Sequence, residues 1–493
     1  MIRVGLTRTQ PSYAGLTPPY HPGKCFPELD TLLGNAGSLG TQNHVYAAVR
    51  AALWGLGLDA ERFGTSEWNP LGQLVGRGKR VVLKPNFIRH WNPEFLGSIE
   101  SVITHGSILR AVADYAFLAV GSEGSVVVAE APQHDCDFSE IRRIVGLNEL
   151  ATFYEETLGH PLEIIDLRRE AVHYKNGVID DRQSLPGDPL GYRSVDLGER
   201  SFFTNSGLNP ARFRGADYDP GPTTVHHAEG RNQYLLSETV LSADLVVNLP
   251  KLKTHKKTGV TLALKNLVGI NGDKNWLPHH STGSVSEGGD EFPGRRLRDR
   301  LRSRATEIAR PLLARGLGTR FFRFARKVES VARGDAFIRS GNWHGNRTTW
   351  RMCADLNRCL YYSDAAGLHL TAEQPVRTVL SIIDGIVAGE GNGPLAPQDV
   401  PLGVVIAATD PIAADLVAIR LMGFDEGKIP KVREVMRDSG PRITGVRWIS
   451  DVRINEIQVE SLQRHELGLD DLRADRIFEA HPGWQGHVEK TSE

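Results

Sequence analysis

The sequence predicts an α/β protein built on a mainly parallel, doubly wound sheet, with a β-rich excursion and an inserted basic helical segment. Short apolar runs that are typical of buried strands alternate with longer segments whose apolar residues recur at helical spacing. Charged and amide side chains follow directly after several of the apolar runs. This arrangement is typical of parallel sheets, which bind ligands where their strands end.

The N-terminal half of the sheet is predicted within residues 40–167. We expect helices and strands to alternate there, with helices at 44–58, 107–120 and 139–158 and strands at 81–83, 125–129 and 162–167. The first 40 residues are rich in Gly, Pro and Ser, so they should be irregular.

The later regions differ in composition. They are a β-rich excursion at 168–235, a lysine-rich strand and helix at 236–290, a basic helical insertion at 291–340, a C-terminal α/β half at 341–460 and a tail at 461–493. In the C-terminal half, we expect strands at 379–386, 402–408 and 447–452. Asp410 and Pro411 should open a helix that Gly423 closes, because Asp caps helices and Pro suits the first turn. The tail is polar after Ile477 and should be loosely packed.

The composition is that of an ordinary globular protein. The chain has 493 residues, 40% of them hydrophobic and 24% charged, with a formal net charge of −1. This balance gives no basis for expecting a specific nucleic acid partner. The amino terminus lacks the apolar core of a secretory signal, and no apolar run approaches the length that spans a bilayer, so we expect a cytoplasmic location.

Four cysteines are too few for a disulfide framework to stabilise a chain of this size, which agrees with a reducing compartment. A four-cysteine iron–sulfur cluster would require Cys25, Cys136, Cys353 and Cys359 to converge. Cys353 and Cys359 lie six residues apart in a predicted helix, about 240° around its axis, so they should not face one cluster together. We therefore expect no such cluster.

The segment between Asp244 and Asp273 contains five lysines and one histidine but no acidic residue. An apolar run at 243–249 is followed at once by Lys251, Lys253 and His255. Several like charges at the end of a core strand repel one another unless an anion lies among them. The segment therefore predicts an anion-binding site.

Two further positions extend this predicted site. Lys84 and Asn86 follow a strand in VVLKPNF, where the proline fixes the chain as it leaves the sheet. Lys265 and Asn266 lie within the apolar run VTLALKNLVGI, where an unpaired ammonium group would cost several kcal/mol. Lys265 must reach water, pair with a carboxylate or contact a ligand. For Lys84, a solvent-exposed lysine before a turn is the simpler alternative.

A glycine-rich stretch, IIDGIVAGEGNGP, supplies acidic groups. A strand is expected to end at Asp384, and glycines then surround Glu390 and Asn392. Glycines let a backbone approach a ligand closely, and the carboxylates could face lysines or a cation. An ordinary glycine turn is the alternative for this stretch, as helix capping is for Asp410.

A basic segment at 295–327 contains twelve Arg and Lys residues against Asp299 and Glu307. Its apolar residues fall on one helical stripe, namely Leu297, Leu301, Ile308 and Leu312. Such a helix can lie on an anionic membrane surface, but it can equally pack on its own protein with its arginines in water.

Three blocks resemble the bacterial and archaeal family called domain of unknown function 362. They are VVLKPN at 81–86, ADLVVNLPKLKTHKKTGVTLALKNLVGI at 243–270, and DGIVAGEGNGP with TDPIAADLVAIRLMG at 384–394 and 409–423. The resemblance extends over about residues 40–440 and implies that the polar residues of these blocks form one site. Some relatives carry ferredoxin-like cysteine motifs, which this sequence lacks, so an electron-transfer role is not implied.

We therefore expect an enzyme, either an isomerase, a transferase or an oxidoreductase, that acts on a small molecule bearing a carboxylate or phosphate. The substrate-binding residues would be Lys84, Asn86, Lys251, Lys253, Asn266 and Asn392. The catalytic residues would be Lys265 and His255, which move protons, with Asp384 and Glu390 assisting. A divalent metal could bind Asp384, Glu390 and Asp410.

Two alternatives remain open. The lysine and histidine content is similar to that of the lactate racemase type, in which a lysine tethers a nickel cofactor. The chain could instead be a non-catalytic protein that contacts the membrane surface through 295–327 and helps to assemble an anionic polymer or a lipid-linked sugar.

Overall fold

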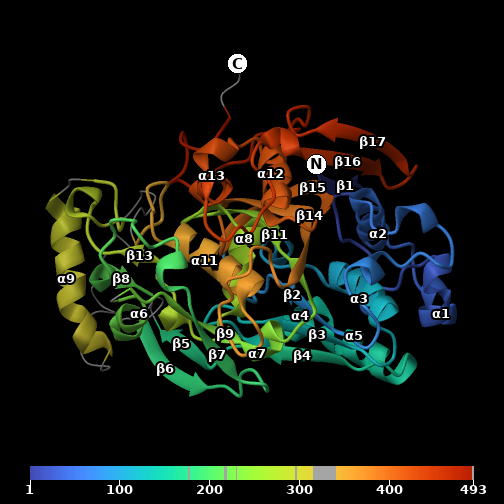
Figure 1. The fold of residues 1–493 in the computed structure, drawn as a ribbon, viewed down its shortest axis with the longest axis horizontal. Coiled ribbons are helices and arrows are strands. Elements are labelled where there is room, and N and C mark those ends of the chain that lie inside the picture. The colour runs from blue at the N-terminus through green and yellow to red at the C-terminus, as the bar shows by residue number, and fades with distance from the viewer. Residues whose placement is uncertain (176–177, 216–218, 229, 295–296, 315–339, 491–493) are drawn as a thin grey trace.

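A computed structural model describes residues 1–175, 178–215, 219–228, 230–294, 297–314 and 340–490 (Figure 1). Its centre is one large sheet with the strand order β17-β16-β1-β15-β14-β10-β2-β3-β4, and β11 pairs with β14 beyond the end of β10. Most of the paired strands are parallel, and β12, β15 and β17 run against the others. The predicted α/β fold class is confirmed.

The strands of the large sheet are β1 Ile2–Arg8, β2 Arg80–Pro85, β3 Ser125–Glu130, β4 Leu162–Asp166, β10 Leu245–Leu249, β11 Lys251–His255, β12 Gly259–Val260, β14 Thr378–Asn392, β15 Ala396–Ala408, β16 Val452–Gln458 and β17 Gln463–Gly468. Three small sheets contain β5 Glu170–Lys175, β6 Val178–Ser184, β7 Tyr192–Asp196, β8 Phe213–Arg214, β9 Gln233–Ser237 and β13 His280–Ser281. Most of these short strands lie in the region predicted to be β-rich.

The helices are α1 Asp30–Leu33, α2 His44–Leu56, α3 Gly106–Val120, α4 Phe138–Val145, α5 Leu147–Thr152, α6 Gly221–His226, α7 Glu238–Leu241, α8 Leu262–Asn266, α9 Leu297–Ala314, α11 Thr349–Tyr362, α12 Pro411–Leu421 and α13 Pro430–Arg437. Asp410 accepts hydrogen bonds from the N–H groups of Ile412 and Ala413, so the predicted cap of α12 is confirmed.

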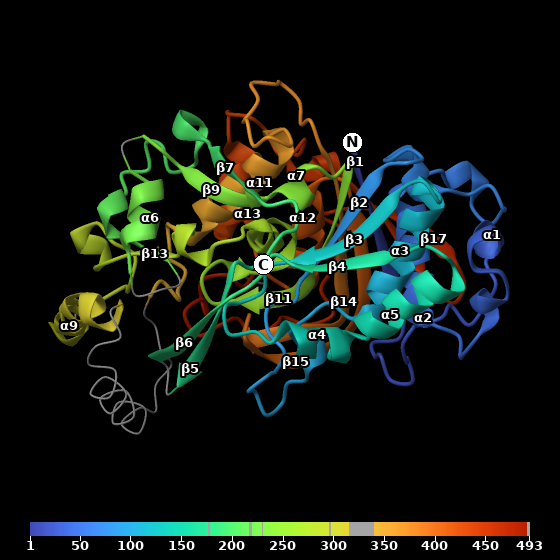
Figure 2. The same ribbon diagram turned by 90° about the horizontal axis from the view of Figure 1, so that it is seen from below.

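Helices cover both faces of the sheet, as a doubly wound fold requires. Figure 2 shows α3 and α5 on one side of β2, β3 and β4, with α11, α12 and α13 on the other. The side chains of β2 alternate accordingly: Val82 packs into one core, and Val81 and Leu83 pack into the other. The strand–helix alternation in the sequence follows from this layering.

The prediction for the first 40 residues was wrong. Residues 2–8 form β1, which lies inside the sheet between β16 and β15. Val4 and Leu6 are fully buried. The high Gly and Pro content belongs to the residues that follow, and one short strand of seven residues was too weak a signal beside them.

The glycine-rich stretch also differs from its prediction. The strand does not end at Asp384 but continues to Asn392, because β15 pairs with it along its whole length. Gly389 is required there, since a Cβ atom would lie 2.8 Å from the Pro397 side chain and 3.0 Å from the Ser101 carbonyl oxygen. The strand predicted at 447–452 is likewise displaced, because residues 449–451 form a turn and β16 follows it.

The C-terminal tail is packed rather than loose. Phe478, Trp484 and Val488 are almost fully buried, and the N–H of Phe478 donates to the Met422 carbonyl oxygen. Hydrophobic residues spaced widely among polar ones carry no helical or strand period, so the sequence did not reveal this packing.

The basic insertion is described in part. Residues 297–314 form α9, while residues 295–296 and 315–339 lie outside the described part of the chain, as do the side chains of Leu297 and Leu312. None of the helices in the described ranges combines the length and the apolar content that crossing a bilayer requires.

Candidate functional site

The carboxyl ends of β3, β2 and β10 lie side by side, next to the middle of β14, because these strands are parallel neighbours. From β2 the chain winds outward through β3 and β4, and β10 and β14 then take the opposite side of β2. Doubly wound proteins bind ligands at such a switch point, just outside the carboxyl ends of the strands. Lys84 and Glu130 lie at the ends of β2 and β3, and Lys251 follows β10 after a single proline.

Lys84 and Glu130 form a buried ion pair at the carboxyl ends of β2 and β3. The Lys84 Nζ lies 2.5 Å from the Glu130 carboxylate and also donates to the Pro85 carbonyl oxygen. Burial lowers the pKa of Lys84, and the Glu130 charge opposes that shift. Gly269 packs directly on the pair: an added Cβ would lie 1.7 Å from the Glu130 carboxylate. Lys84 is therefore already neutralised by the protein.

The Asn266 side chain links α8 to β2 and β10 through hydrogen bonds. Its amide N–H groups donate to the Asn248 side chain and to the carbonyl oxygens of Lys84 and Pro85, and its oxygen accepts from Asn86 and Lys84. Every polar atom of this side chain is therefore used by the protein, so its predicted substrate contact is replaced by a structural role. The Asn86 side-chain oxygen, in contrast, is buried without a hydrogen-bond partner in the described chain.

Lys251 forms a second buried pair, with Asp384. Their charged atoms lie 3.0 Å apart, and the Tyr13 hydroxyl contacts both groups. The backbone N–H of His105 donates to the same carboxylate. The His105 ring stacks on the Tyr13 ring, with 3.9 Å between the ring centroids. Burial lowers the pKa of His105 to about 3, which keeps its ring neutral. Lys251 and Asp384 thus neutralise each other.

Lys253 and His255 lie on the same strand, β11. The Lys253 Nζ donates to the Val102 carbonyl oxygen, and the described chain supplies no carboxylate to it. Burial, followed by the charges of Lys251 and Lys265, lowers the pKa of Lys253 well below its usual value. Burial and the Lys265 charge do the same to His255, so its imidazole is neutral.

Lys265 is the central residue of this arrangement. Its side chain is only 9% exposed, and it has neither a hydrogen bond nor an ion pair within the described chain. Burial lowers its pKa. Besides acting on the Cys353 thiol, its charge lowers the pKa values of six basic neighbours, which are Lys84, Lys253, His255, Lys257, Lys274 and His279. We call these six residues and Lys265 the cationic cluster.

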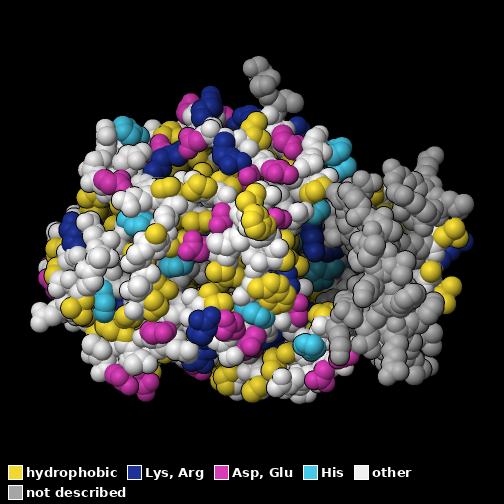
Figure 3. All heavy atoms as spheres, turned by 180° about the vertical axis from the view of Figure 1, so that it is seen from behind, with side chains coloured by type: hydrophobic (Ala, Val, Ile, Leu, Met, Phe, Trp, Pro, Cys, Tyr) yellow, Lys and Arg dark blue, Asp and Glu magenta, His cyan; other side chains and the backbone are white. Residues whose placement is uncertain are grey.

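The outer members of the cationic cluster are also held by backbone carbonyl oxygens. Lys274 donates to Ala131, and Lys257 donates to Ser340. Burial is the main reason why the pKa of each falls to about 7. On the face drawn in Figure 3, Lys or Arg and His side chains gather in a recess beside the grey atoms.

Glu390 does not contribute to the cationic cluster. Both of its oxygens bind the Arg476 guanidinium, and one also accepts from the N–H of Glu479. It lies six residues along β14 from Asp384, roughly 20 Å at about 3.3 Å per residue. The structure therefore does not bring these two carboxylates together.

The predicted metal site is also corrected. Asp410 follows β15, which runs antiparallel to β14, and so lies at the opposite edge of the sheet from Asp384. Its carboxylate is occupied by Thr444, Gly445 and the start of α12. Within the described residues, no group of three His, Cys, Asp or Glu side chains could hold a metal ion. Asn392 is exposed at the far end of β14.

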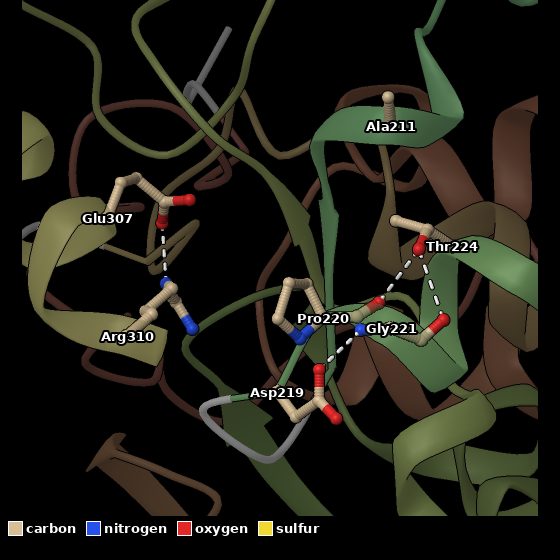
Figure 4. A pocket seen from close by; sticks show the side chains of 7 residues that line it. All are labelled: Ala211, Asp219, Pro220, Gly221, Thr224, Glu307 and Arg310. Atoms are coloured by element: carbon tan, nitrogen blue, oxygen red, sulfur yellow. Dashed lines mark hydrogen bonds and ion pairs between the residues drawn. The ribbon is translucent and has the colours of Figure 1, made fainter. Parts of the chain in front are cut away.

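An open pocket elsewhere on the surface has no connection with these residues. It lies between α6 and α9, has a volume of about 440 Å³ and is drawn in Figure 4. The Asp219 carboxylate accepts from the N–H of Gly221, and Thr224 donates to the Pro220 carbonyl oxygen. Because these polar groups bind one another, little is left to orient a ligand there.

Several residues of the site were not predicted. Glu130 ends a strand that is followed by Ala and Pro, so the pattern that singled out Lys84 could have indicated it. Lys274 lies just outside the acid-free lysine run. Tyr13 and His105 carried no comparable signal, because their partner Asp384 is several hundred residues away.

Comparisons with known proteins match part of the chain. The family model described as "Domain of unknown function (DUF362)" matches residues 196–420, which include β10, β11 and α8 but not Lys84. The "Thylakoid-associated protein sll1697" of Synechocystis sp. is 23% identical over 260 residues, or 50% of this chain and 55% of that protein. The chain thus matches about half the length of this curated relative.

Proposed function

Residues 196–420 belong to the DUF362 family, whose description assigns no reaction, and we propose that the protein is an enzyme acting on a small carboxylate or phosphate compound at the cationic cluster. The anion would lie among Lys253, Lys265 and Lys274. Lys84 and Lys251 would support the site indirectly, because each is paired with a carboxylate of the protein.

The observation that carries the proposal is Lys265, a residue only 9% exposed whose ammonium has neither a hydrogen bond nor an ion pair within the described chain. Leaving a charge in this state costs several kcal/mol, and a bound anion would remove that cost. The charge of Glu130 acts on Lys253, Lys265 and Lys274, but its carboxylate is already paired with Lys84. These three lysines have no carboxylate partner within the described residues, which favours an anionic guest over a structural salt-bridge network.

His255 is suited to binding an anion as a hydrogen-bond donor. Its ring is neutral near pH 7, and its Nδ1 accepts from the backbone N–H of Lys257, which orients the ring and fixes the tautomer. Its Nε2 therefore carries the hydrogen and can donate to a bound anion. Asp384 would act indirectly, by holding Lys251 and the N–H of His105.

The test is calorimetric titration of the full chain with inorganic phosphate and with oxalate. Lys265→Met should weaken binding of at least one of them by about tenfold or more, since it removes a charge-assisted contact. It should leave the melting temperature unchanged or raised, because a buried charge is replaced by an apolar group of similar length. Lys79→Met, at an exposed ion pair with Asp244, is the matched control.

Two results would contradict the proposal. One is equal affinity of the wild type and Lys265→Met for both anions. The other is a large fall in the melting temperature of Lys265→Met, which would make Lys265 a structural residue.

A second candidate function is contact with an anionic membrane surface, and the exposed side of α9 favours it. Leu301 is 57% and Ile308 is 75% exposed. Because they are seven residues apart, the two side chains lie on the same side of the helix. The opposite, polar side of α9 binds the protein through Glu307 to Arg214 and through Ser303 to Glu291. Figure 3 shows hydrophobic side chains exposed at this edge of the molecule. The relative's description as thylakoid-associated is consistent with a protein of this kind.

Vesicle flotation tests this second candidate. The full chain should float with phosphatidylglycerol vesicles and remain behind with phosphatidylcholine vesicles. The double change Leu301→Glu, Ile308→Glu should abolish flotation, whereas Leu368→Glu, at an equally exposed leucine elsewhere, should not. Absence of flotation by the wild type would remove the membrane role and leave the anion site unaffected.

A further inference from the structure

The backbone that carries Lys265 is held firmly. Helix α8 starts at Leu262, whose φ of +53° is rare for a residue with a side chain. The Asp415 carboxylate accepts from the N–H of Ala263 at 2.6 Å, and Lys431, which is paired with Asp415, donates to the Thr261 carbonyl oxygen. At its other end, Asn266 ties the helix to β2 and β10. Lys265 therefore projects from a fixed position.

Lys265 also differs from the other buried lysines. Lys84, Lys251 and Lys431 are paired with carboxylates. Lys253 and Lys274 donate to carbonyl oxygens. The described chain offers Lys265 neither kind of partner, so its nitrogen is not occupied by the protein. A lysine held rigidly, buried and unbound has the attributes of an amine nucleophile.

We propose that the Lys265 Nζ forms a covalent imine with an aldehyde or ketone that also carries a carboxylate or phosphate. This inference rests on the proposed anion site, because Lys253 and Lys274 would hold the anionic group while the carbonyl carbon faces Lys265. The neighbouring cations serve both purposes: they attract the anion, and they disfavour the protonated form of Lys265. Burial is the main cause that lowers the pKa of Lys265, the Lys431 charge lowers it further, and Cys353 and Glu130 oppose the shift.

The imine can form with water as the only proton carrier. The fraction of Lys265 that has released its proton to solvent supplies the free amine. This amine adds to the carbonyl carbon, forming the C–N bond, and the C=O π pair becomes the hydroxyl of a carbinolamine after proton transfer from nitrogen. That hydroxyl takes a proton from solvent and leaves as water, while the nitrogen lone pair forms the C=N bond. The protonated imine makes the neighbouring C–H or C–C bond easier to break.

Reductive trapping tests the proposal on the full chain. The probes are two matched pairs, glyoxylate with acetaldehyde and glycolaldehyde phosphate with glycolaldehyde, each with sodium borohydride, followed by peptide mass spectrometry. Lys265 should be modified in preference to exposed lysines, and at least one anionic probe should react about tenfold or more faster than its uncharged partner. The pair that shows this difference identifies a carboxylate or a phosphate substrate. In the wild-type protein, inorganic phosphate should slow the modification of Lys265.

Lys265→Arg separates the imine from the anion site. Arginine keeps the positive charge but cannot form the imine, so this variant should retain phosphate binding by calorimetry and lose the adduct. Wild-type protein that binds phosphate but gives no preferred adduct at Lys265 would overturn the imine and leave the proposed function standing. Protein that neither binds the anions nor gives the adduct would overturn both.

Discussion

The lysines of the cationic cluster show how burial alone can change what a side chain does. Lys84 has a carboxylate beside it and remains a charged, structural group. Lys274 has only carbonyl oxygens, which stabilise an ammonium less, and its pKa falls to about 7. Lys265 has neither. One residue type therefore supplies an ion pair, a group that titrates near neutrality and a candidate nucleophile within a few neighbouring positions.

Lys274 should make stability depend on pH. Its pKa is about 7 in the folded protein and 10.5 in the unfolded chain, so between these values the unfolded chain binds more protons. The free energy of unfolding should therefore rise with pH from about 7 to about 10, by up to about 1.4 kcal/mol per pH unit for this group. Urea unfolding of wild type and Lys274→Met across this range measures it.

The variant should show a flatter dependence of stability on pH than the wild type. Lys79→Met, an exposed lysine, should leave the slope unchanged. Equal slopes in wild type and Lys274→Met would show that Lys274 keeps its proton in the folded protein.

Residue type and position predicted part of the site. The lysines after β2 and β10 could be identified because a proline or strand end precedes them, and Lys265 because it interrupts an apolar run. Their partners could not be identified. Which lysine meets Glu130 or Asp384 depends on strand order, and neither residue is close to its partner in the sequence.

The short elements that follow the strands position the site more than the strands do. Helix α8 has only five residues, yet Asp415, Lys431 and Asn266 fix both of its ends. The 3₁₀ turn Leu267–Ile270 that follows lays Gly269 against the Lys84–Glu130 pair. Since a short helix has little stability of its own, these contacts determine where Lys265 lies.

Gly269→Ala should therefore be strongly destabilising. The new methyl group would have to displace the Glu130 carboxylate or the Lys84 ammonium, and breaking a buried pair costs about 3–5 kcal/mol. Gly76→Ala provides the control, because nothing lies within 4 Å of its added Cβ. Urea denaturation of both variants would give the two losses, and a loss below about 1 kcal/mol for Gly269→Ala would mean that the pair can move aside.

Most helices and parallel strands were predictable because each has its own period of apolar residues. The extended hairpin of β14 and β15 was not: glycines at 385, 389, 391 and 393 resemble a turn, and only pairing along the whole of β15 keeps that stretch extended. The same hairpin separates Glu390 and Asp410 from Asp384, which is why the acidic half of the predicted site did not assemble.

Both chain ends are integral to the molecule. Residues 2–8 complete the sheet, and the C-terminal segment returns to the turn after β11. There the Trp484 indole N–H donates to the Lys256 carbonyl oxygen, and its ring covers Gly259. This segment thus supports the cationic cluster from outside the matched family region. Neither contact is visible in local sequence patterns, because each joins residues that are hundreds of positions apart.

Trp484→Ala should cost about 3–5 kcal/mol of stability, as large-to-small changes of buried aromatic residues do. It should also weaken anion binding, because the turn between β11 and β12 loses its cover. Trp448→Ala, at a tryptophan that is 71% exposed, should change neither property. Thermal unfolding and phosphate titration provide the two readouts, and unchanged stability of Trp484→Ala would show that the tail is dispensable.

The position of β1 has a consequence for biosynthesis. Its two neighbours, β15 and β16, are translated almost 400 and about 450 residues later, so the first strand leaves the ribosome long before it has anything to pair with. Until then its apolar side chains and unpaired backbone groups are exposed to other chains. Nascent protein should consequently depend on chaperones until β15 and β16 have been translated, and truncated variants that lack β16 and β17 should aggregate rather than fold as a smaller unit.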